Sequence, residues 1–326
     1  MKKNMKILTL VLTVVLVVAL AVSSVACAPK TDFTVGVLQL VQHDALDAAT
    51  QGFVDALNEE MAKAGKTVEI IVQNASGETA NCSTIAGSFV AKGVDLIMAN
   101  ATPALQAVAN ATMTIPILGT SVTEYGVALG IDNFNGTVGG NISGTSDLAP
   151  LEDQANILVD LLPEAKTVGI LYCSAEANSK YQADTIKALL ESKNLTVVVK
   201  TFTDSNDIAA VLNSMVDDVD ALYLPTDNVV ASNATIIANI CGPAKLPVFA
   251  GEEGICKVAG FATLSISYYE LGKQTGKMAA DILLGKANIS NMPISYDPNP
   301  VKKYVKSICE DLGIEIPADF VEIVID

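Results

Sequence analysis

The sequence predicts an α/β protein of two similar lobes, each a doubly wound parallel sheet, joined by strands that cross between them. Two observations predict this fold. Apolar runs of strand length alternate with longer segments of helical period, which is typical of parallel sheets covered by helices on both faces. The same order of segments then recurs in the second half. With 326 residues, half of them hydrophobic, the chain is long enough for two such lobes.

The alternation is clearest in the first half of the chain. The apolar run 34–40 predicts a buried strand, and apolar residues spaced three and four apart predict an amphipathic helix over 45–64. A helix is also expected to begin at Pro103, because the fixed φ of proline suits a helix start. The other predicted elements are strands at 68–72, 94–99 and 115–118 and helices at 83–92 and from Pro103 to about residue 110.

Three strand segments of the first half have counterparts in the second. Residues 35–38, 95–98 and 115–118 are echoed, in the same order, by residues 168–171, 220–223 and 246–249. The offsets are 133, 125 and 131 residues. Three matches in order at a nearly constant offset indicate two copies of one α/β unit.

Two segments are suited to cross between the copies. The glycine-rich segment 136–144 lies between them, and the apolar segment 263–267 follows the second copy. A helix predicted at 268–284 would return to the first lobe. We therefore expect a signal peptide at 1–26, an N-terminal lobe formed by 27–145 and 267–290, and a C-terminal lobe formed by 146–266 and 291–326.

The N-terminus has the pattern of a targeting segment. Three lysines among the first six residues precede an apolar run at 7–22, and small residues then lead to Cys27. This order resembles a lipoprotein leader, so we expect export and a lipid on Cys27 that anchors the chain to the outer face of the cytoplasmic membrane. Ordinary signal cleavage and an uncleaved anchor are the alternatives. No later stretch reaches the ~18 apolar residues of a spanning helix.

Composition and missing motifs exclude several classes of protein. A formal net charge of −16 argues against nucleic-acid partners, and a single histidine excludes a multi-histidine metal site. Residues 65–67, Gly-Lys-Thr, lack the glycine five positions earlier that a phosphate-binding loop requires. No dinucleotide fingerprint, nucleophile elbow or CxxC pair occurs. We therefore expect no metal, no cofactor and no catalysis. The five cysteines after Cys27 could form at most two disulfides, and buried or free thiols are the simpler expectation.

Polar residues follow most of the predicted strands. Ligands of open α/β sheets bind at the carboxyl ends of the strands, so these side chains are the candidates for ligand contact. An alternative is that each merely caps a helix, since Ser, Thr, Asp and Asn are the usual N-caps. His43 lies near the same edge, where a surface or capping role is the alternative. The candidate ligand-binding residues are Gln39, Thr102, Thr123, Ser146, Asn178, Asp227, Asn228 and Glu252.

Six segments carry a resemblance to a known family. They lie at 35–53, 95–107, 141–154, 176–179, 224–230 and 266–285 and span nearly all of the chain after the leader. In these segments the sequence resembles the ABC transporter substrate-binding lipoproteins of the tryptophan/tyrosine-binding type. The resemblance implies a type I periplasmic-binding fold and delivery of a small solute, in several members an aromatic amino acid, to a membrane permease. Glu124-Tyr125 stands where that family usually has Asp-Pro.

The function expected from the residues and the resemblance is capture of a small solute, with an amino acid as the first candidate, by a monomer whose partners are permease subunits. The chain has no arginine, so hydroxyls and backbone N–H groups, with Thr102, Thr123 and Ser146 as examples, would hold a carboxylate. The ammonium would pair with Asp227 first and Glu252 second. A module that senses a ligand for a membrane receptor is an alternative function, and an enzyme on the same scaffold would need a nucleophile and base that the sequence does not reveal.

Overall fold

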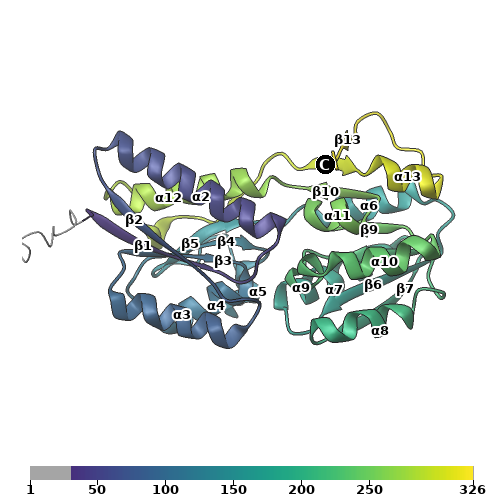
Figure 1. Ribbon diagram of the computed structural model, residues 1–326, viewed down its shortest axis with the longest axis horizontal. Coiled ribbons are helices and arrows are strands. Elements are labelled where there is room, and N and C mark those ends of the chain that lie inside the picture. Colours follow the sequence, from purple (N-terminus) through teal and green to yellow (C-terminus); the bar gives the residue numbers. More distant parts are fainter. Residues whose placement is uncertain (1–30, 326) are drawn as a thin grey trace, which may run out of the picture. The chain divides into compact units, whose positions relative to one another are not determined.

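The computed structural model describes residues 31–325, and its first sheet is parallel throughout (Figure 1). The strand order is β11-β5-β4-β3-β1-β2. The strands are β1 (Phe33–Gln39), β2 (Val68–Asn74), β3 (Leu96–Asn100), β4 (Ile117–Val122), β5 (Ile142–Ser146) and β11 (Ser295–Tyr296). The accompanying helices are α2 (Asp44–Lys63), α3 (Thr79–Lys92), α4 (Thr102–Ala111), α5 (Tyr125–Leu129), α12 (Tyr268–Leu283) and the 3₁₀ turn η2 (Ile289–Asn291).

The second sheet has the order β13-β12-β10-β9-β8-β6-β7, and within it β12 runs antiparallel to β10. Its strands are β6 (Thr167–Cys173), β7 (Thr196–Phe202), β8 (Ala221–Leu224), β9 (Val248–Ala250), β10 (Ala262–Ser265), β12 (Val301–Tyr304) and β13 (Val321–Glu322). Its helices are α6 (Leu151–Leu161), α7 (Ala177–Ser192), η1 (Ser205–Asp207), α8 (Ile208–Asn213), α9 (Asn228–Ser232), α10 (Ala234–Ala244), α11 (Glu253–Ala259) and α13 (Lys306–Leu312).

The two sheets share one topology, as the internal repeat predicts. The order β2-β1-β3-β4-β5 in the first sheet corresponds to β7-β6-β8-β9-β10 in the second. The three pairs of segments matched in the sequence give β1 and β6, β3 and β8, and β4 and β9, which occupy equivalent places. The predicted fold class, two similar parallel-sheet lobes, is confirmed.

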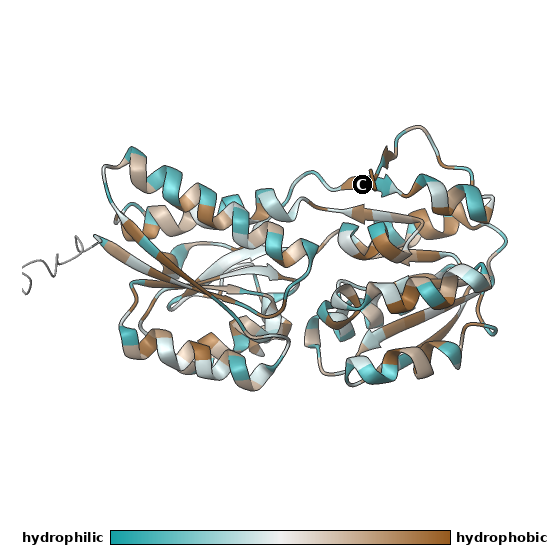
Figure 2. Cartoon of the chain, viewed as in Figure 1, coloured by the Kyte–Doolittle hydropathy of each residue, from teal (hydrophilic) through white to brown (hydrophobic). Residues whose placement is uncertain are grey.

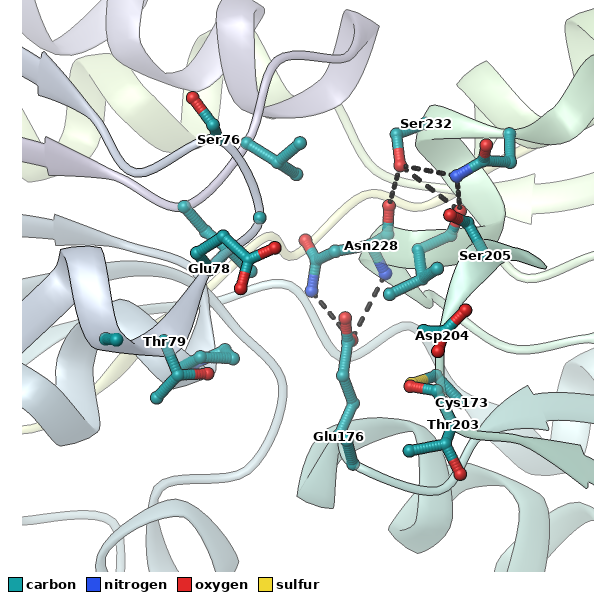
Figure 3. Close-up of a pocket in the computed structure, with 18 residues that line it drawn as sticks. Ser76, Glu78, Thr79, Cys173, Glu176, Thr203, Asp204, Ser205, Asn228 and Ser232 are labelled. Carbon is teal, nitrogen blue, oxygen red and sulfur yellow. Dashed lines mark hydrogen bonds between the residues drawn. The ribbon is translucent and has the colours of Figure 1, made fainter. Parts of the chain in front are cut away.

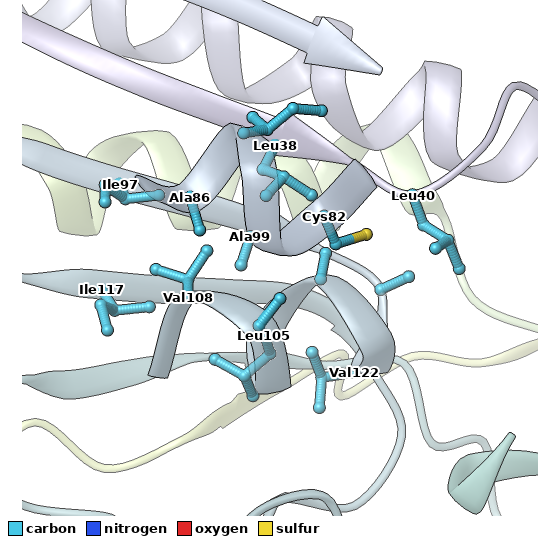
Figure 4. Close-up of a cluster of buried hydrophobic side chains, with 14 of the residues drawn as sticks. Leu38, Leu40, Cys82, Ala86, Ile97, Ala99, Leu105, Val108, Ile117 and Val122 are labelled. Atoms are coloured by element: carbon cyan, nitrogen blue, oxygen red, sulfur yellow. The ribbon is translucent and has the colours of Figure 1, made fainter. Parts of the chain in front are cut away.

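Both faces of the first sheet are buried. Val35 and Val37 of β1 pack toward α2 and α12. Leu38 lies on the opposite face, in one cluster with Cys82 and Ala86 of α3 (Figure 4). Successive side chains of a strand point to opposite faces, so burial of both faces requires an unbroken apolar run. In Figure 2 the hydrophobic colour is concentrated on the strands, and the covering helices alternate between hydrophobic and hydrophilic residues.

Helix α12 returns to the first lobe, as expected from the sequence, and packs along α2. Two glycines permit the close approach. A Cβ on Gly272 would lie 2.0 Å from the carbonyl oxygen of Ala49, and a Cβ on Gly52 would lie 2.1 Å from that of Tyr269. The helices therefore touch backbone to backbone.

The chain passes between the sheets three times, after β5, after β10 and after β11. The expected lobe boundary at residue 291 falls at the end of η2. The next strand, β11, still belongs to the first sheet because it pairs with β5. The chain therefore reaches the second sheet only at β12, later than the expected boundary. A two-residue strand has no periodic pattern that the sequence could reveal.

The predicted leader and Cys27 lie outside the described residues. Within residues 31–325, no helix combines the length and the apolar character needed to cross a membrane. The five cysteines of this part of the chain are buried free thiols, as expected: Cys82, Cys173, Cys241, Cys256 and Cys309.

Candidate functional site

Residues that follow the strands of both sheets enclose a small polar cavity of about 10 Å³, roughly the room that one water molecule needs. Parallel strands bring their carboxyl ends to one edge of a sheet, and the loops at that edge supply the lining. Among the described residues that line the cavity, none is a lysine. The lining consists of His43, Leu46, Ser121, Asp147, Asn178, Thr226, Asp227, Asn228, Ala231, Glu252 and Tyr268.

Unpaired polar atoms are concentrated in this cavity. Seven buried side-chain oxygens have no hydrogen-bond partner among the described residues, and four of them belong to residues that line the cavity. A buried polar group without a partner typically costs about 1–3 kcal/mol. A ligand that met all four would remove that cost. The four atoms are Ser121 Oγ, Asp147 Oδ1, Asn178 Oδ1 and Thr226 Oγ1.

Ser121 is held in a strained backbone conformation. Its φ is +52°, and the pairing register of β4 with β5 shifts between Gly119 and Val122. Left-handed backbone at a residue other than glycine costs on the order of 1–3 kcal/mol and persists where the surroundings impose it. The irregularity places Ser121 in the cavity lining instead of continuing the regular strand.

Asp147 is the first residue after β5 and lies where the chain leaves the first sheet. The side chain is almost fully buried, and its Oδ2 accepts a hydrogen bond of 3.0 Å from the hydroxyl of Tyr268. Thr123 also hydrogen-bonds to this carboxyl group. Burial raises the pKa of Asp147. Because Tyr268 begins α12, the pair joins two of the three passages between the sheets.

Asp227 is held by backbone N–H groups of its own lobe. Its Oδ1 accepts from Val230 N at 2.9 Å, which caps α9, and its Oδ2 accepts from Cys173 N at 2.7 Å. Burial raises the pKa of the carboxyl group. Asp227 therefore lines the cavity, as the ligand-contact interpretation expects, and also caps a helix, as the alternative interpretation expects.

Two further carboxyl groups adjoin the cavity. Glu252 caps α11 by accepting from Gly254 N at 2.6 Å and Ile255 N at 2.5 Å, and burial raises its pKa to about 7. Glu176 Oε2 accepts from Asn178 Nδ2 at 3.1 Å and from Asn228 Nδ2 at 2.8 Å. Burial, followed by the nearby Asp227 carboxylate, raises the pKa of Glu176.

The two lobes touch each other beside the cavity. His43 Nε2 lies 3.4 Å from Asn228 Oδ1, and Lys257 Nζ lies 3.6 Å from Asp44 Oδ2. Burial lowers the pKa of His43. Both contacts join the start of α2 to helices of the second lobe.

A larger hollow of about 420 Å³ also borders Asn228, which lines both spaces. Figure 3 shows Glu176 and Asn228 joined by hydrogen bonds on one wall, with Ser76, Glu78 and Thr79 on the facing wall. Leu40, Val41, Pro103 and Val229 add apolar surface to this hollow.

The structure brings four of the predicted ligand-binding residues together in the cavity lining: Asn178, Asp227, Asn228 and Glu252. The other four are outside the lining. Gln39 donates to Val41 O and Asp47 Oδ1, and Ser146 Oγ donates to Thr123 O. Thr102 is buried with its hydroxyl unpaired, but it does not border the cavity. Ligand contact by these residues stays a prediction.

Sequence reasoning did not select Asp147 or Tyr268. Asp147 follows the crossing strand directly, which was the available signal, but its partner Tyr268 is 121 residues away.

Among residues 31–325, no group of three His, Cys, Asp or Glu side chains could hold a metal ion.

Known proteins resemble this chain over nearly all of its described length. The family model described as ABC transporter substrate binding protein matches residues 34–322. The tyrosine-binding protein of Clostridioides difficile (strain R20291) is 36% identical over 266 residues, which are 82% of this chain and 76% of that protein.

Two solved structures share the fold closely. An ABC domain from Streptococcus pneumonia in complex with L-Trp is 32% identical, with a TM-score of 0.85 over 90% of this chain and 100% of that one. A ligand-free, open structure of a substrate-binding protein with adhesive properties from Clostridium difficile is 37% identical, with a TM-score of 0.69 over 89% of this chain and 99% of that one. From its family match, its two-lobed fold and its cleft lined by both lobes, the chain belongs to the ABC transporter substrate-binding protein family.

Proposed function

We propose that the chain captures an aromatic L-amino acid between its lobes, with the charged groups at the polar cavity and the ring toward the hollow beyond Asn228, and delivers it to the permease of an ABC importer. The observation that carries this proposal is the chemistry of the four unpaired atoms. Ser121 and Thr226 offer hydroxyl groups that can donate, whereas Asp147 and Asn178 offer oxygens that accept. Two donors and two acceptors in one cavity match the carboxylate and ammonium of an amino acid.

The ammonium is assigned to Asp147 and Asn178. Asp227, the first choice from the sequence, already accepts backbone N–H groups at both oxygens, and Glu252 does the same. Asp147 keeps one oxygen unpaired in the cavity. A charge-assisted hydrogen bond to this oxygen would pair the ligand's cation with a carboxylate that is otherwise buried at a cost.

The carboxylate is assigned to the hydroxyls of Ser121 and Thr226. The chain contains no arginine, so the bidentate clamp that usually binds carboxylates is missing. Ser121 belongs to the first lobe and Thr226 to the second, so a ligand held by both would draw the lobes together.

The aromatic class is supported by the relatives. One relative is named for tyrosine and another was crystallised with L-Trp. The hollow beyond Asn228, with its apolar residues, offers room for a ring.

Import by the chain requires export and contact with a permease. The leader pattern supports export with a lipid on Cys27, and the family supports delivery to an ABC permease. The test begins with mass spectrometry of ligand released from the purified, denatured protein. Calorimetric titration with L-tyrosine and L-tryptophan should then give micromolar or tighter binding. Binding of neither, with a sugar as the released ligand, would reject the proposal.

A further inference from the structure

Four buried carboxyl groups surround the cavity, and its described lining includes no lysine to pair with them. Asp147, Asp227 and Glu252 line it, and Glu176 hydrogen-bonds to the lining residues Asn178 and Asn228. The described lining contains no lysine, and the whole chain contains no arginine.

Four carboxylates cannot all stay ionised in such a place. Loss of solvent and mutual repulsion both favour the protonated form. Asp227 and Glu252 each receive two backbone N–H groups, which stabilise a negative charge. The Asp147 carboxyl has only one such group, its own backbone N–H, besides the hydroxyls of Tyr268 and Thr123, and its Oδ1 has no hydrogen-bond partner from another described residue.

We propose that the cavity exchanges a proton for the ligand's ammonium group: Asp147 holds a proton while the cavity is empty and releases it when the ammonium binds. This inference rests on the proposed function and adds to it the mechanism of recognition. The O–H bond of Asp147 breaks, its proton leaves to bulk water, and N–H groups of the ammonium donate to the freed carboxylate. The ammonium replaces the proton as the partner of the carboxylate, so the pair of Asp147 and ammonium stays neutral, and the released proton balances the charge of the ligand's own carboxylate.

The groups around Asp147 give no alternative source of positive charge. Tyr268 of α12 and Tyr125 of α5 are neutral phenols whose pKa values are raised by burial. His43 at the start of α2 faces the same cavity with its pKa lowered by burial. Asp227 beside α9 and Glu252 beside α11 add negative potential. Within the described lining, only the ligand can bring a lasting cation.

The exchange restricts the class of ligand. An ammonium becomes obligatory, whereas the carboxylate contributes affinity through neutral hydroxyls alone. L-Tyrosine should bind with proton release, and tyramine, which keeps the ammonium and lacks the carboxylate, should bind more weakly with the same release. N-Acetyl-L-tyrosine, which has no ammonium, should not bind.

Calorimetry in buffers of different ionisation enthalpy tests the exchange, because the difference in apparent heat counts the protons released. For L-tyrosine we expect close to one proton per ligand at pH 5.5, falling as pH rises. The dissociation constant should improve by up to about tenfold per pH unit where a full proton is released. Asp147→Asn should abolish both effects, whereas Asp220→Asn, a change at an exposed carboxylate accepting backbone N–H groups, should keep them.

Infrared spectroscopy of the empty protein gives an independent reading. A carbonyl band of a protonated carboxyl group should be present at pH 6 in the wild type and reduced in Asp147→Asn. Tight binding of L-tyrosine without proton release would overturn the exchange and leave the proposed function standing. If no aromatic amino acid binds, the proposed function fails, and the Asp147-dependent infrared band alone then decides whether this carboxyl holds a proton.

Discussion

At the scale of single residues, two aspartates at the ends of β8 show how environment changes the same carboxyl group. Asp220 precedes the strand, is largely exposed, and accepts from Lys166 N and Thr167 N at 2.8 Å, which lowers its pKa. Asp227 follows the strand and is buried, which raises its pKa. Only the buried one adjoins the cavity.

Asp147 and Asp227 should respond differently to the same change. Asp147→Asn removes the proposed ammonium partner, and a charge-assisted hydrogen bond of about 1.5–3 kcal/mol corresponds to a loss of affinity for L-tyrosine of roughly tenfold to a hundredfold. Asp227→Asn leaves an amide nitrogen facing a backbone N–H, so it should mainly lower the free energy of unfolding, by about 1–3 kcal/mol. Titration and thermal melting separate the effects. If Asp227→Asn instead weakened binding and Asp147→Asn mainly lowered stability, Asp227 would be the partner of the ammonium.

Ser121 offers a second test at this scale. Ser121→Gly relieves the left-handed backbone but removes a hydroxyl, so thermal stability should hold or rise while affinity for L-tyrosine falls by about tenfold. Lys245→Gly is the matched control, because Lys245 has a φ of +54° at the end of α10 and is not in the cavity lining. It should leave affinity unchanged. Unchanged affinity in Ser121→Gly as well would remove this hydroxyl from the site.

At the scale of elements, the glycine contact between α2 and α12 is sensitive to one added methyl group. Gly272→Ala places a Cβ 2.0 Å from a carbonyl oxygen of α2 and must push the helices apart, at a cost of about 1–3 kcal/mol or more. Gly87→Ala in α3 meets no atom within 4 Å and should stabilise by about 0.5–1 kcal/mol. Chemical denaturation of both variants checks the contrast. If the two variants changed the free energy of unfolding equally, α2 and α12 would be able to move apart at no cost.

The same elements show what the sequence could and could not predict. Strands buried on both faces have unbroken apolar runs and the long helix α2 has a strong periodic pattern, so their existence and order were predictable. The bulge that turns Ser121 toward the cavity depends on pairing with β5, and the partnership of Asp147 with Tyr268 depends on α12 returning to the first lobe. Such contacts between distant segments leave no local pattern, so the sequence predicted the edge of the site but not its central carboxyl group.

At the scale of the whole molecule, attachment to the membrane is predicted to depend on one residue. If Cys27 carries lipid, Cys27→Ala should move the protein from the membrane fraction into the soluble fraction, where it should bind ligand as the wild type does. The measurement is fractionation of cells followed by immunodetection. A variant that stays in the membrane fraction would indicate an uncleaved apolar leader instead.

The pH dependence of stability is also a property of the whole molecule, and its sign follows from the buried carboxyl groups. The pKa of Glu252 is raised to about 7, and those of Glu176, Asp227 and Asp147 are raised as well. Between the usual carboxyl range and about 8, the value to which the pKa of Glu176 is raised, the folded state therefore binds more protons than the unfolded state. The free energy of unfolding must then fall as pH rises through this window.

The empty protein should accordingly melt at a higher temperature at pH 5.5 than at pH 8, while the increase in melting temperature caused by L-tyrosine should be larger at pH 8. General repulsion among the acidic residues would also lower the melting temperature of the empty protein as pH rises. A variant is therefore needed to separate this repulsion from the titration of the buried carboxyl groups. Glutamine mimics a protonated glutamic acid and can still accept from Asn228, so Glu176→Gln should melt with a shallower dependence on pH. A wild-type slope in this variant would assign the pH dependence to surface charge and remove Glu176 from the explanation.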